Sequence, residues 1–276
     1  MAIDYNMPLE DYHANAAISK SGLDLIRRSP LHYWEAYLNP EGEGRKVTDA
    51  LRMGTAFHVL VLEPDQYRNL VAVAPDVDKR TKAGKEEWQA FEYANDGKII
   101  VKPKENDTLH RMAESVLKKK AAMIALKGKG HVEASLFWQD PITLQECRCR
   151  PDWLRTDGLL VDLKTTTDAS PAGFEKSAYN YRYHVQAAFY REGVLRAAGA
   201  NTEGFVFIAV EKEPPYAVGV YHATEEFMRL GEIDFRRDME VYAEAMTSDN
   251  WPGYPDTIEP LALPRWVSKQ LEYGAE

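Results

Sequence analysis

Residues 158–166 read GLLVDLKTT, and this stretch decides the fold. Its run of aliphatic residues, closed by two β-branched threonines, predicts a strand that enters the core. Side chains two positions apart lie on one face of a strand, so Asp162 and Lys164 project together, while Val161 and Leu163 take the other face. Two opposite charges in such a strand are either an ion pair at a sheet edge or functional groups. Taken alone, the D-x-K pattern favours the ion pair.

The residues before this strand supply a second carboxylate. Arg155-Thr-Asp-Gly158 is typical of a turn between two strands, so the chain returns to Asp152 on the neighbouring strand of a hairpin. Two carboxylates and an ammonium group then converge at the end of that hairpin. Two carboxylates with a backbone carbonyl form a hard oxygen site suited to Mg²⁺ or Mn²⁺, and a lysine beside it can orient water or stabilise charge on a phosphate. With Asp152 included, the metal site and the ion pair are equally good interpretations.

The remaining patterns surround this hairpin with helices and further strands. Helical patterns cover residues 21–28, 48–62, 79–95, 104–127, 171–199 and 224–246, and a further helix starts at Pro30; Ser21 and Thr48 are candidate N-caps. Strand patterns cover 132–138, 143–154, 204–211 and 216–222. We expect an α/β fold with a central mixed sheet of about five strands flanked by helices. We expect one domain over residues 1–276, with a mainly helical part (1–127), a sheet-containing core (128–246) and a surface tail (247–276).

Composition narrows the functional classes. The chain has 276 residues and a net charge of −9, which argues against a protein that coats nucleic acid through bulk charge but not against a nucleic-acid enzyme. No apolar run reaches the ~18 residues of a membrane span, and the N-terminal stretch lacks the apolar segment of a signal peptide. The two cysteines, Cys147 and Cys149, are too few for an iron–sulfur cluster and fit a reducing cytoplasm.

Two helical patterns carry further polar groups. The stretch MGTAFHVLVLE puts Gly54 and His58 on one helical face, where the glycine leaves room beside the imidazole. His58 is either a core histidine bonded locally or a ligand for Mn²⁺ or Mg²⁺. The stretch YHVQAAFYREG puts Gln186 and Tyr190 on one face. Their polar tips either bond a phosphate or a base edge, or are ordinary helix surface.

Taken together, the order of these motifs resembles the RecB-type branch of the PD-(D/E)xK nuclease superfamily. The motifs are Gly54-Thr-Ala-Phe-His58, Pro151-Asp152, Asp162-Leu-Lys164 and Gln186-Ala-Ala-Phe-Tyr190. The segment ISKSGLDLIRRSPLHYWEAYLNP is also similar to the first helices of this group, and the whole looks most like the RecE-type exonuclease domain (exodeoxyribonuclease VIII), often phage-encoded. The resemblance extends over roughly residues 10–245 and implies a restriction-endonuclease-like core.

The resemblance also implies roles for single residues in the metal site. Asp152 and Asp162 would ligate the metals, and the carbonyl of Leu163 would add a backbone ligand. His58 would ligate a second metal or lie next to it. Glu133 precedes Asp152 by one strand, where relatives often carry an acid, so it is a possible ligand; an exposed strand glutamate is an equally good interpretation.

The implied reaction is metal-dependent hydrolysis of DNA. Lys164 would orient the attacking water, and Gln186 and Tyr190 would contact DNA near the scissile phosphate. With Mg²⁺, or Mn²⁺ in its place, such enzymes degrade one strand of duplex DNA from its 5′ end and leave 3′ single-stranded overhangs for recombination by strand annealing. The resemblance implies an oligomeric ring that holds double-stranded DNA with a free end, and a RecT-like single-strand annealing protein as partner.

A ring of this kind needs locally basic walls. The candidate residues are Lys118-Lys119-Lys120, Lys127, Lys129, Arg148 and Arg150. A solvated helix face is the alternative for the lysine run. Two other functions stay open on the same fold: an endonuclease of restriction or repair type, and an inactive DNA-binding relative. No G-x-x-x-x-G-K-[ST] loop is present, so the sequence indicates no ATP-driven motor.

Overall fold

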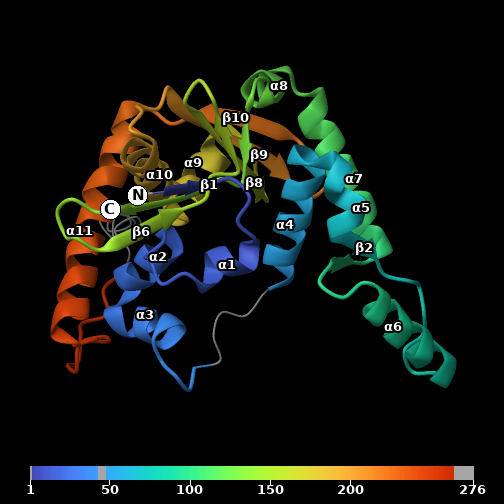
Figure 1. Cartoon of the computed structure of the whole chain (residues 1–276), viewed down its shortest axis with the longest axis horizontal. Helices are drawn as coiled ribbons and strands as arrows, with labels where there is room; N and C mark the ends of the chain where they lie inside the picture. Colours follow the sequence, from blue (N-terminus) through green and yellow to red (C-terminus); the bar gives the residue numbers. More distant parts are fainter. Residues whose placement is uncertain (1, 43–47, 264–276) are drawn as a thin grey trace, which may run out of the picture.

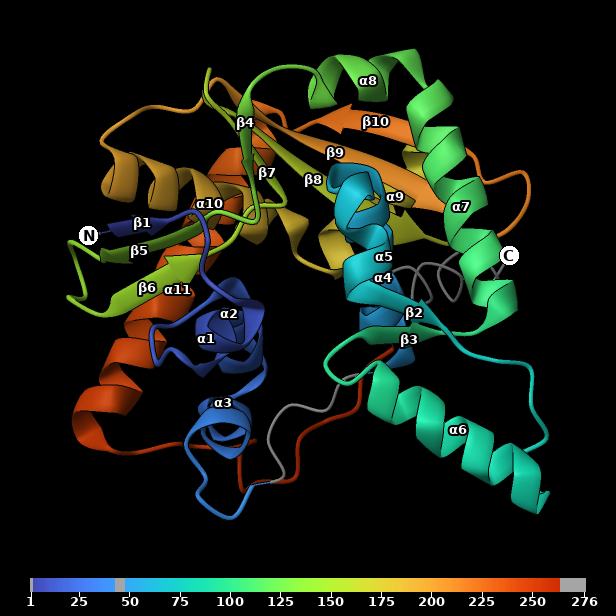
Figure 2. The same ribbon diagram turned by 45° about the vertical axis from the view of Figure 1, so that its right-hand side comes forward.

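The computed structural model describes residues 2–42 and 48–263. Its main sheet has five strands, the number that the sequence predicts, and they lie in the order β10-β9-β8-β7-β4 (Figure 1 and Figure 2). Strands β8 and β9 are parallel and the other neighbours are antiparallel. The strands are β4 (Gly130–Val132), β7 (Trp153–Arg155), β8 (Leu159–Thr166), β9 (Gly204–Glu211) and β10 (Val218–His222).

A second, three-stranded antiparallel sheet was not predicted. It consists of β1 (Ala2–Asp4), β5 (Ser135–Gln139) and β6 (Glu146–Cys149). The two long strands expected at 132–138 and 143–154 are therefore each split between the sheets. The first bends at Glu133, whose φ is 52°, and the second at Pro151, which has no amide hydrogen for a strand ladder. The amide of Glu133 donates to the carbonyl of Asp152 at 3.1 Å, so the two bends lie side by side.

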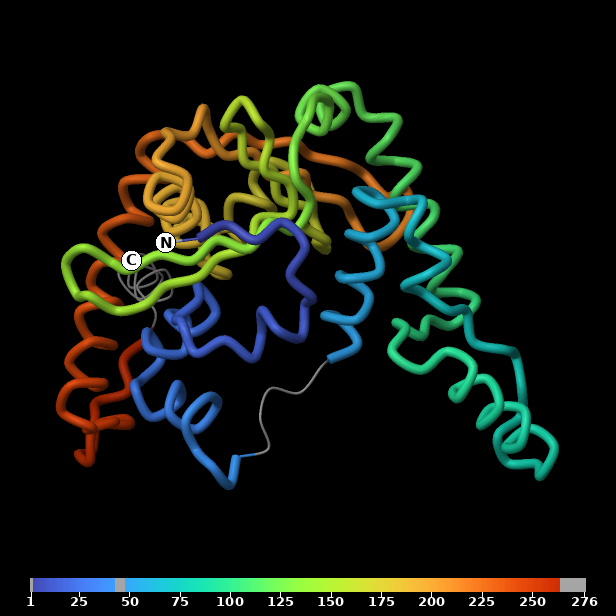
Figure 3. Tube along the Cα trace, in the orientation of Figure 1, coloured from blue at the N-terminus to red at the C-terminus, as the bar shows by residue number. Residues whose placement is uncertain are grey.

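The N-terminal part is mainly helical, with a small two-stranded parallel sheet. Its elements are α1 (Leu9–Ala14), α2 (Lys20–Arg28), α3 (Pro30–Tyr37), α4 (Asp49–Leu62), η1 (Pro64–Gln66), α5 (Tyr67–Leu70), β2 (Val71–Val73), α6 (Lys82–Ala94), β3 (Ile99–Val101), α7 (Pro103–Lys118) and α8 (Lys120–Leu126). Thr48 caps α4 as predicted. Ser19, and not Ser21, caps α2, because its hydroxyl accepts from the amide of Gly22. Figure 3 shows that α6 extends away from the rest of the chain.

Three helices follow the central hairpin. They are α9 (Pro171–Asn180), α10 (Tyr183–Ala198) and α11 (Glu225–Ser248). The helical stretch expected at 171–199 is broken at Arg182, which adopts a left-handed conformation with φ of 55°. No helix in the described ranges is long and apolar enough to cross a bilayer.

Strand β8 runs through the middle of the main sheet with both faces covered. Leu160 faces one hydrophobic core, packed with residues of α10, α11 and α2, while Val161 and Leu163 face another, packed with α4 and α7. Figure 2 shows α4 in front of the sheet and α7 along its side. Asp162 and Lys164 do form an ion pair, but its expected place at a sheet edge is wrong, because β8 has a strand on each side.

Two thiols lie inside this framework. Cys147 and Cys149, both on β6, are buried and unbonded to each other. Burial raises the pKa of each thiol. Both cysteines are therefore held as neutral thiols in the folded chain.

The turn before α10 is held by a partly buried charge network. Arg182 donates to Asp24 of α2 at 3.0 Å and to Asp238 of α11. Asp238 is buried, and Arg237 lies 3.5 Å from its other oxygen. The Arg182 guanidinium thus joins two helices to the start of the helix that carries Gln186.

Replacing Arg182 by methionine should lower the free energy of unfolding by about 3 kcal/mol, because it leaves the buried carboxylate of Asp238 with only a distant partner. Urea unfolding would measure the change. Arg191→Met is the matched control, since Arg191 pairs with the exposed Glu225 at 3.8 Å and its loss should cost less than about 1 kcal/mol. Equal, small losses in the two variants would contradict a structural role for Arg182.

Candidate metal centre and active site

The two bends place Asp152 against the central strand. The β7–β8 register pairs Trp153 with Val161, so the next position along sets Asp152 opposite Asp162. Asp152 Oδ2 accepts a hydrogen bond from the amide of Leu163 at 2.7 Å, which fixes the carboxylate. Both carboxylates are buried, with Asp162 only 1% exposed. The hairpin predicted from the sequence therefore brings the two acids together.

His58 reaches this pair from helix α4. Its Nε2 lies 3.1 Å from the carbonyl oxygen of Leu163, and its Nδ1 lies 3.5 Å from Asp152 Oδ1 and 3.9 Å from Glu133 Oε1. His58, Glu133 and Asp152 each present one donor atom, and these atoms lie within 4.8 Å of one another. A Cβ added to Gly54 would meet no atom within 4 Å, so the space one turn before the imidazole is open.

Asp162 is held by two side chains on its own face of the sheet. Lys164 Nζ forms an ion pair with Asp162 Oδ1, and Gln186 Nε2 of α10 donates to Asp162 Oδ2. Asp162 is thus a buried carboxylate whose charge is matched by a lysine, and a divalent ion bound there would share its oxygens with these two side chains.

Gln186 is buried and Tyr190 is half-buried, so neither residue lies on an open helix surface. Gln186 is buried on Asp162, which rules out the surface interpretation for this residue. Tyr190 packs against the hydrophobic core beside Phe205, and burial raises the pKa of its hydroxyl well above the ordinary value. The DNA contact expected of Tyr190 stays a prediction.

Two neighbours of Lys164 were missed from the sequence. The ring of Tyr183 lies 4.7 Å from Lys164 Nζ, and Lys20 Nζ lies 6.0 Å from the same ring. Tyr183 precedes Gln186 by three positions on α10, so the same-face rule could have found it. Lys20 comes from α2, far away in the sequence, and no local pattern connects it to the site.

The basic residues expected to line a ring divide into two groups. Lys118, Lys119 and Lys120 are exposed, and Lys118 pairs with Glu114 at 2.5 Å, which agrees with the solvated-face alternative. Arg148 and Arg150 are buried, so their assignment to an exposed wall is wrong. Their long side chains turn inward from β6 and the segment after it.

Crowding of charge shifts the proton affinities in the site. Burial, together with the charge of Asp162, raises the pKa of Asp152 to about 7, against the opposing effect of His58. Burial alone would lower the pKa of His58, but the carboxylates of Asp152 and Glu133 outweigh it and raise the value to about 9. For Lys164, burial is likewise outweighed by the carboxylates of Asp162 and Asp152, which raise its pKa. A divalent ion must displace the excess protons from these ligands.

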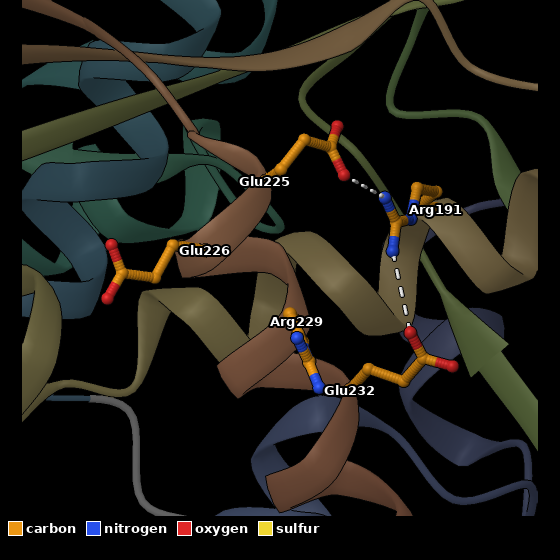
Figure 4. Close-up of a pocket in the computed structure, with 5 residues that line it drawn as sticks. All are labelled: Arg191, Glu225, Glu226, Arg229 and Glu232. Carbon is orange, nitrogen blue, oxygen red and sulfur yellow. Dashed lines mark ion pairs between the residues drawn. The ribbon is translucent and has the colours of Figure 1, made fainter.

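A pocket on α10 and α11 contains none of these residues. Figure 4 shows Arg191 between Glu225 and Glu232, with ion pairs of 3.8 and 3.7 Å. Glu226 and Arg229 complete its lining. Its charges are mixed and largely paired, so we assign no site there.

Residues 19–264 match a family described as a PDDEXK-like domain of unknown function (DUF3799). The chain belongs to this family. The match covers the hairpin, α4 and α10, and so includes every residue of the candidate metal centre. The chain therefore carries a nuclease-type domain of the PD-(D/E)xK superfamily.

A solved structure shares this fold over nearly the whole chain. A protein from Eubacterium rectale, described as a “putative exonuclease”, matches with a TM-score of 0.64 at 13% identity, over 94% of this chain and 97% of its own. A second, SSO0001, matches at 13% identity over 70% of this chain and 87% of its own, with a TM-score of only 0.29. The comparison with curated proteins gives no match.

Ion binding should strengthen as the pH rises from about 6 to about 9, because Asp152 loses its proton near pH 7 and His58 near pH 9. Titration calorimetry with Mn²⁺ near pH 7, in two buffers of different ionisation enthalpy, should report release of about 1.5 protons per ion, roughly half a proton from Asp152 and one from His58. In the variant His58→Gln the rise in affinity above about pH 8 should disappear. An affinity that is flat across this range would contradict the assignment of these groups as ligands.

Proposed function

We propose that this PD-(D/E)xK protein is a metal-dependent 5′-to-3′ exonuclease of double-stranded DNA that produces 3′ single-stranded overhangs. The observation that carries the proposal is the meeting of His58, Glu133 and Asp152 beside the Asp162–Lys164 pair. The fold shared with the E. rectale protein supports it at the level of architecture.

The donor set fits a small divalent cation. It combines an imidazole nitrogen, the carboxylates of Glu133, Asp152 and Asp162, and the carbonyl of Leu163. Hard oxygen donors favour Mg²⁺, and one imidazole also admits Mn²⁺. When bound, such an ion acidifies water and offsets negative charge on a phosphate.

The protein's own groups then orient the reaction. The amide of Leu163 holds Asp152, and Gln186 holds one oxygen of Asp162, so neither carboxylate needs to reorganise during turnover. Lys164 presents an ammonium group beside Asp162, where it can position the attacking water and stabilise charge on the phosphate. The ring of Tyr183 limits the positions open to that ammonium group.

Strand polarity, the oligomeric ring and the RecT-like annealing partner belong to the same proposal. A ring that encloses its DNA needs little bulk positive charge, which fits the net charge of −9. Free, buried cysteines fit a reducing compartment such as the cytoplasm.

Lys164→Ala and Asp162→Ala should each lower the rate of duplex degradation by about 10²–10⁴-fold, because the first removes the ammonium group beside the reacting phosphate and the second removes a carboxylate ligand for the metal. A linear duplex labelled separately at each 5′ and 3′ end, with and without Mg²⁺, measures both rate and polarity. Lys85→Ala, at an exposed lysine of α6, is the control and should retain full activity.

Two results would overturn parts of this assignment. Undiminished digestion by the Lys164 or Asp162 variant would remove the catalytic site. Cutting of a covalently closed circular plasmid would replace the exonuclease by an endonuclease on the same fold, since an exonuclease needs a free end.

A further inference from the structure

A second candidate site lies against strand β6. A cavity of about 300 Å³ opens between the segment 13–19, helix α3 and strand β6. Arg148 lines it and is only 3% exposed. Figure 1 shows β6 beside α2, and a bridge between Ile18 and Cys147 joins the segment to the strand. We call this cavity the Arg148 pocket.

The guanidinium of Arg148 lacks partners that its burial demands. Its Nε and Nη1 are buried and donate no hydrogen bond within the described residues. None of the described residues lining the pocket is an aspartate or a glutamate. An arginine keeps its proton under all ordinary conditions, so the charge cannot be removed by titration. A buried charge with unsatisfied donors is costly unless something of opposite charge binds it.

Arg150, two residues further on, is also buried, but its guanidinium has hydrogen-bond partners. Both guanidinium groups lie over the ring of Tyr12, at 4.7 Å for Arg148 and 4.5 Å for Arg150. Arg150 donates to the hydroxyl of Ser135 at 2.9 Å and to the carbonyl of Met7 at 2.8 Å. Packing on Tyr12 is therefore common to both, and the unused donors are particular to Arg148.

The neighbouring groups favour an oxyanion. Ser19, the N-cap of α2, also lines the pocket, so the positive end of that helix lies at its wall. The planar fork of arginine matches two oxygens of a phosphate. Arg148 is four residues from Asp152, at most about 14 Å along the chain, which corresponds to about four nucleotides of a DNA strand.

We propose that the Arg148 pocket binds a phosphate group of the substrate DNA strand, at a short distance from the bond that is cut. The need for an oxyanion follows from Arg148 and its surroundings, whereas the identity of that oxyanion as a DNA phosphate rests on the proposed nuclease function. The pocket would set how the strand lies across the metal centre.

The first test uses inorganic phosphate and needs no activity. Phosphate, compared with chloride at equal ionic strength, should raise the Tm of the whole protein by about 2–4 °C. Arg148→Met should abolish this rise without lowering the Tm in chloride, because the arginine has no hydrogen bonds to lose. Arg150→Met is the control: it should lower the Tm in chloride and keep the phosphate effect. Arg148→Lys, which keeps the charge but loses the fork, should show a reduced effect.

A phosphate effect that persists unchanged in Arg148→Met and Arg148→Lys would overturn the proposed role of the pocket.

The second test measures binding of a fluorescent duplex in Ca²⁺, with either a phosphate or a hydroxyl at its 5′ ends. Arg148→Met should weaken binding about tenfold. Loss only with the phosphorylated duplex assigns a terminal phosphate, and equal loss with both assigns an internal one. Unchanged DNA affinity would overturn the DNA assignment.

The two proposals fail in different ways. If the protein degrades no DNA but is stabilised by phosphate through Arg148, the proposed nuclease function is wrong and the oxyanion site stands. If it degrades DNA equally well with and without Arg148, and phosphate does not stabilise it, the nuclease function stands and the proposed pocket is wrong.

Discussion

The hydrogen bond from the amide of Glu133 to the carbonyl of Asp152 joins the two bends on which the rest of the structure depends. At this corner two strands leave one sheet and enter the other, and each bend presents a carboxylate to His58, Glu133 from one bend and Asp152 from the other. Helix α4 packs against the face of β8 that carries Val161 and Leu163, and it brings His58 to these carboxylates. The site thus forms where strand pairing is interrupted. Such interruptions often lie next to active sites, because they change the direction in which side chains point.

The local parts of the fold could be predicted from the sequence, and the parts made by distant contacts could not. Periodicity and turn residues located the hairpin, and with it Asp152 opposite Asp162. The split of the two long strands was missed, because an alternating pattern continues unchanged through Glu133 while the backbone turns. β1 was missed for a related reason: three residues carry too little pattern, and their pairing with β5 is made across more than 130 positions.

The candidate site divides in the same way. Residues that belong to a motif, such as Asp162, Lys164 and Gln186, were found and do lie together. Residue types alone could not tell an exposed arginine from a buried one, so Arg148 and Arg150 were placed on a surface that they do not occupy. Burial depends on which segment covers the strand, and here the covering segment is residues 13–19, joined to β6 by the bridge between Ile18 and Cys147.

The neutral thiols of β6 can report on local opening of the structure around this strand. Only a thiolate reacts readily with alkylating reagents, and burial keeps Cys147 and Cys149 protonated on the strand that carries Arg148. Alkylation therefore requires β6 to separate from the segment 13–19 that covers it. The rate of that reaction follows the local opening of the small sheet, independently of any catalytic turnover.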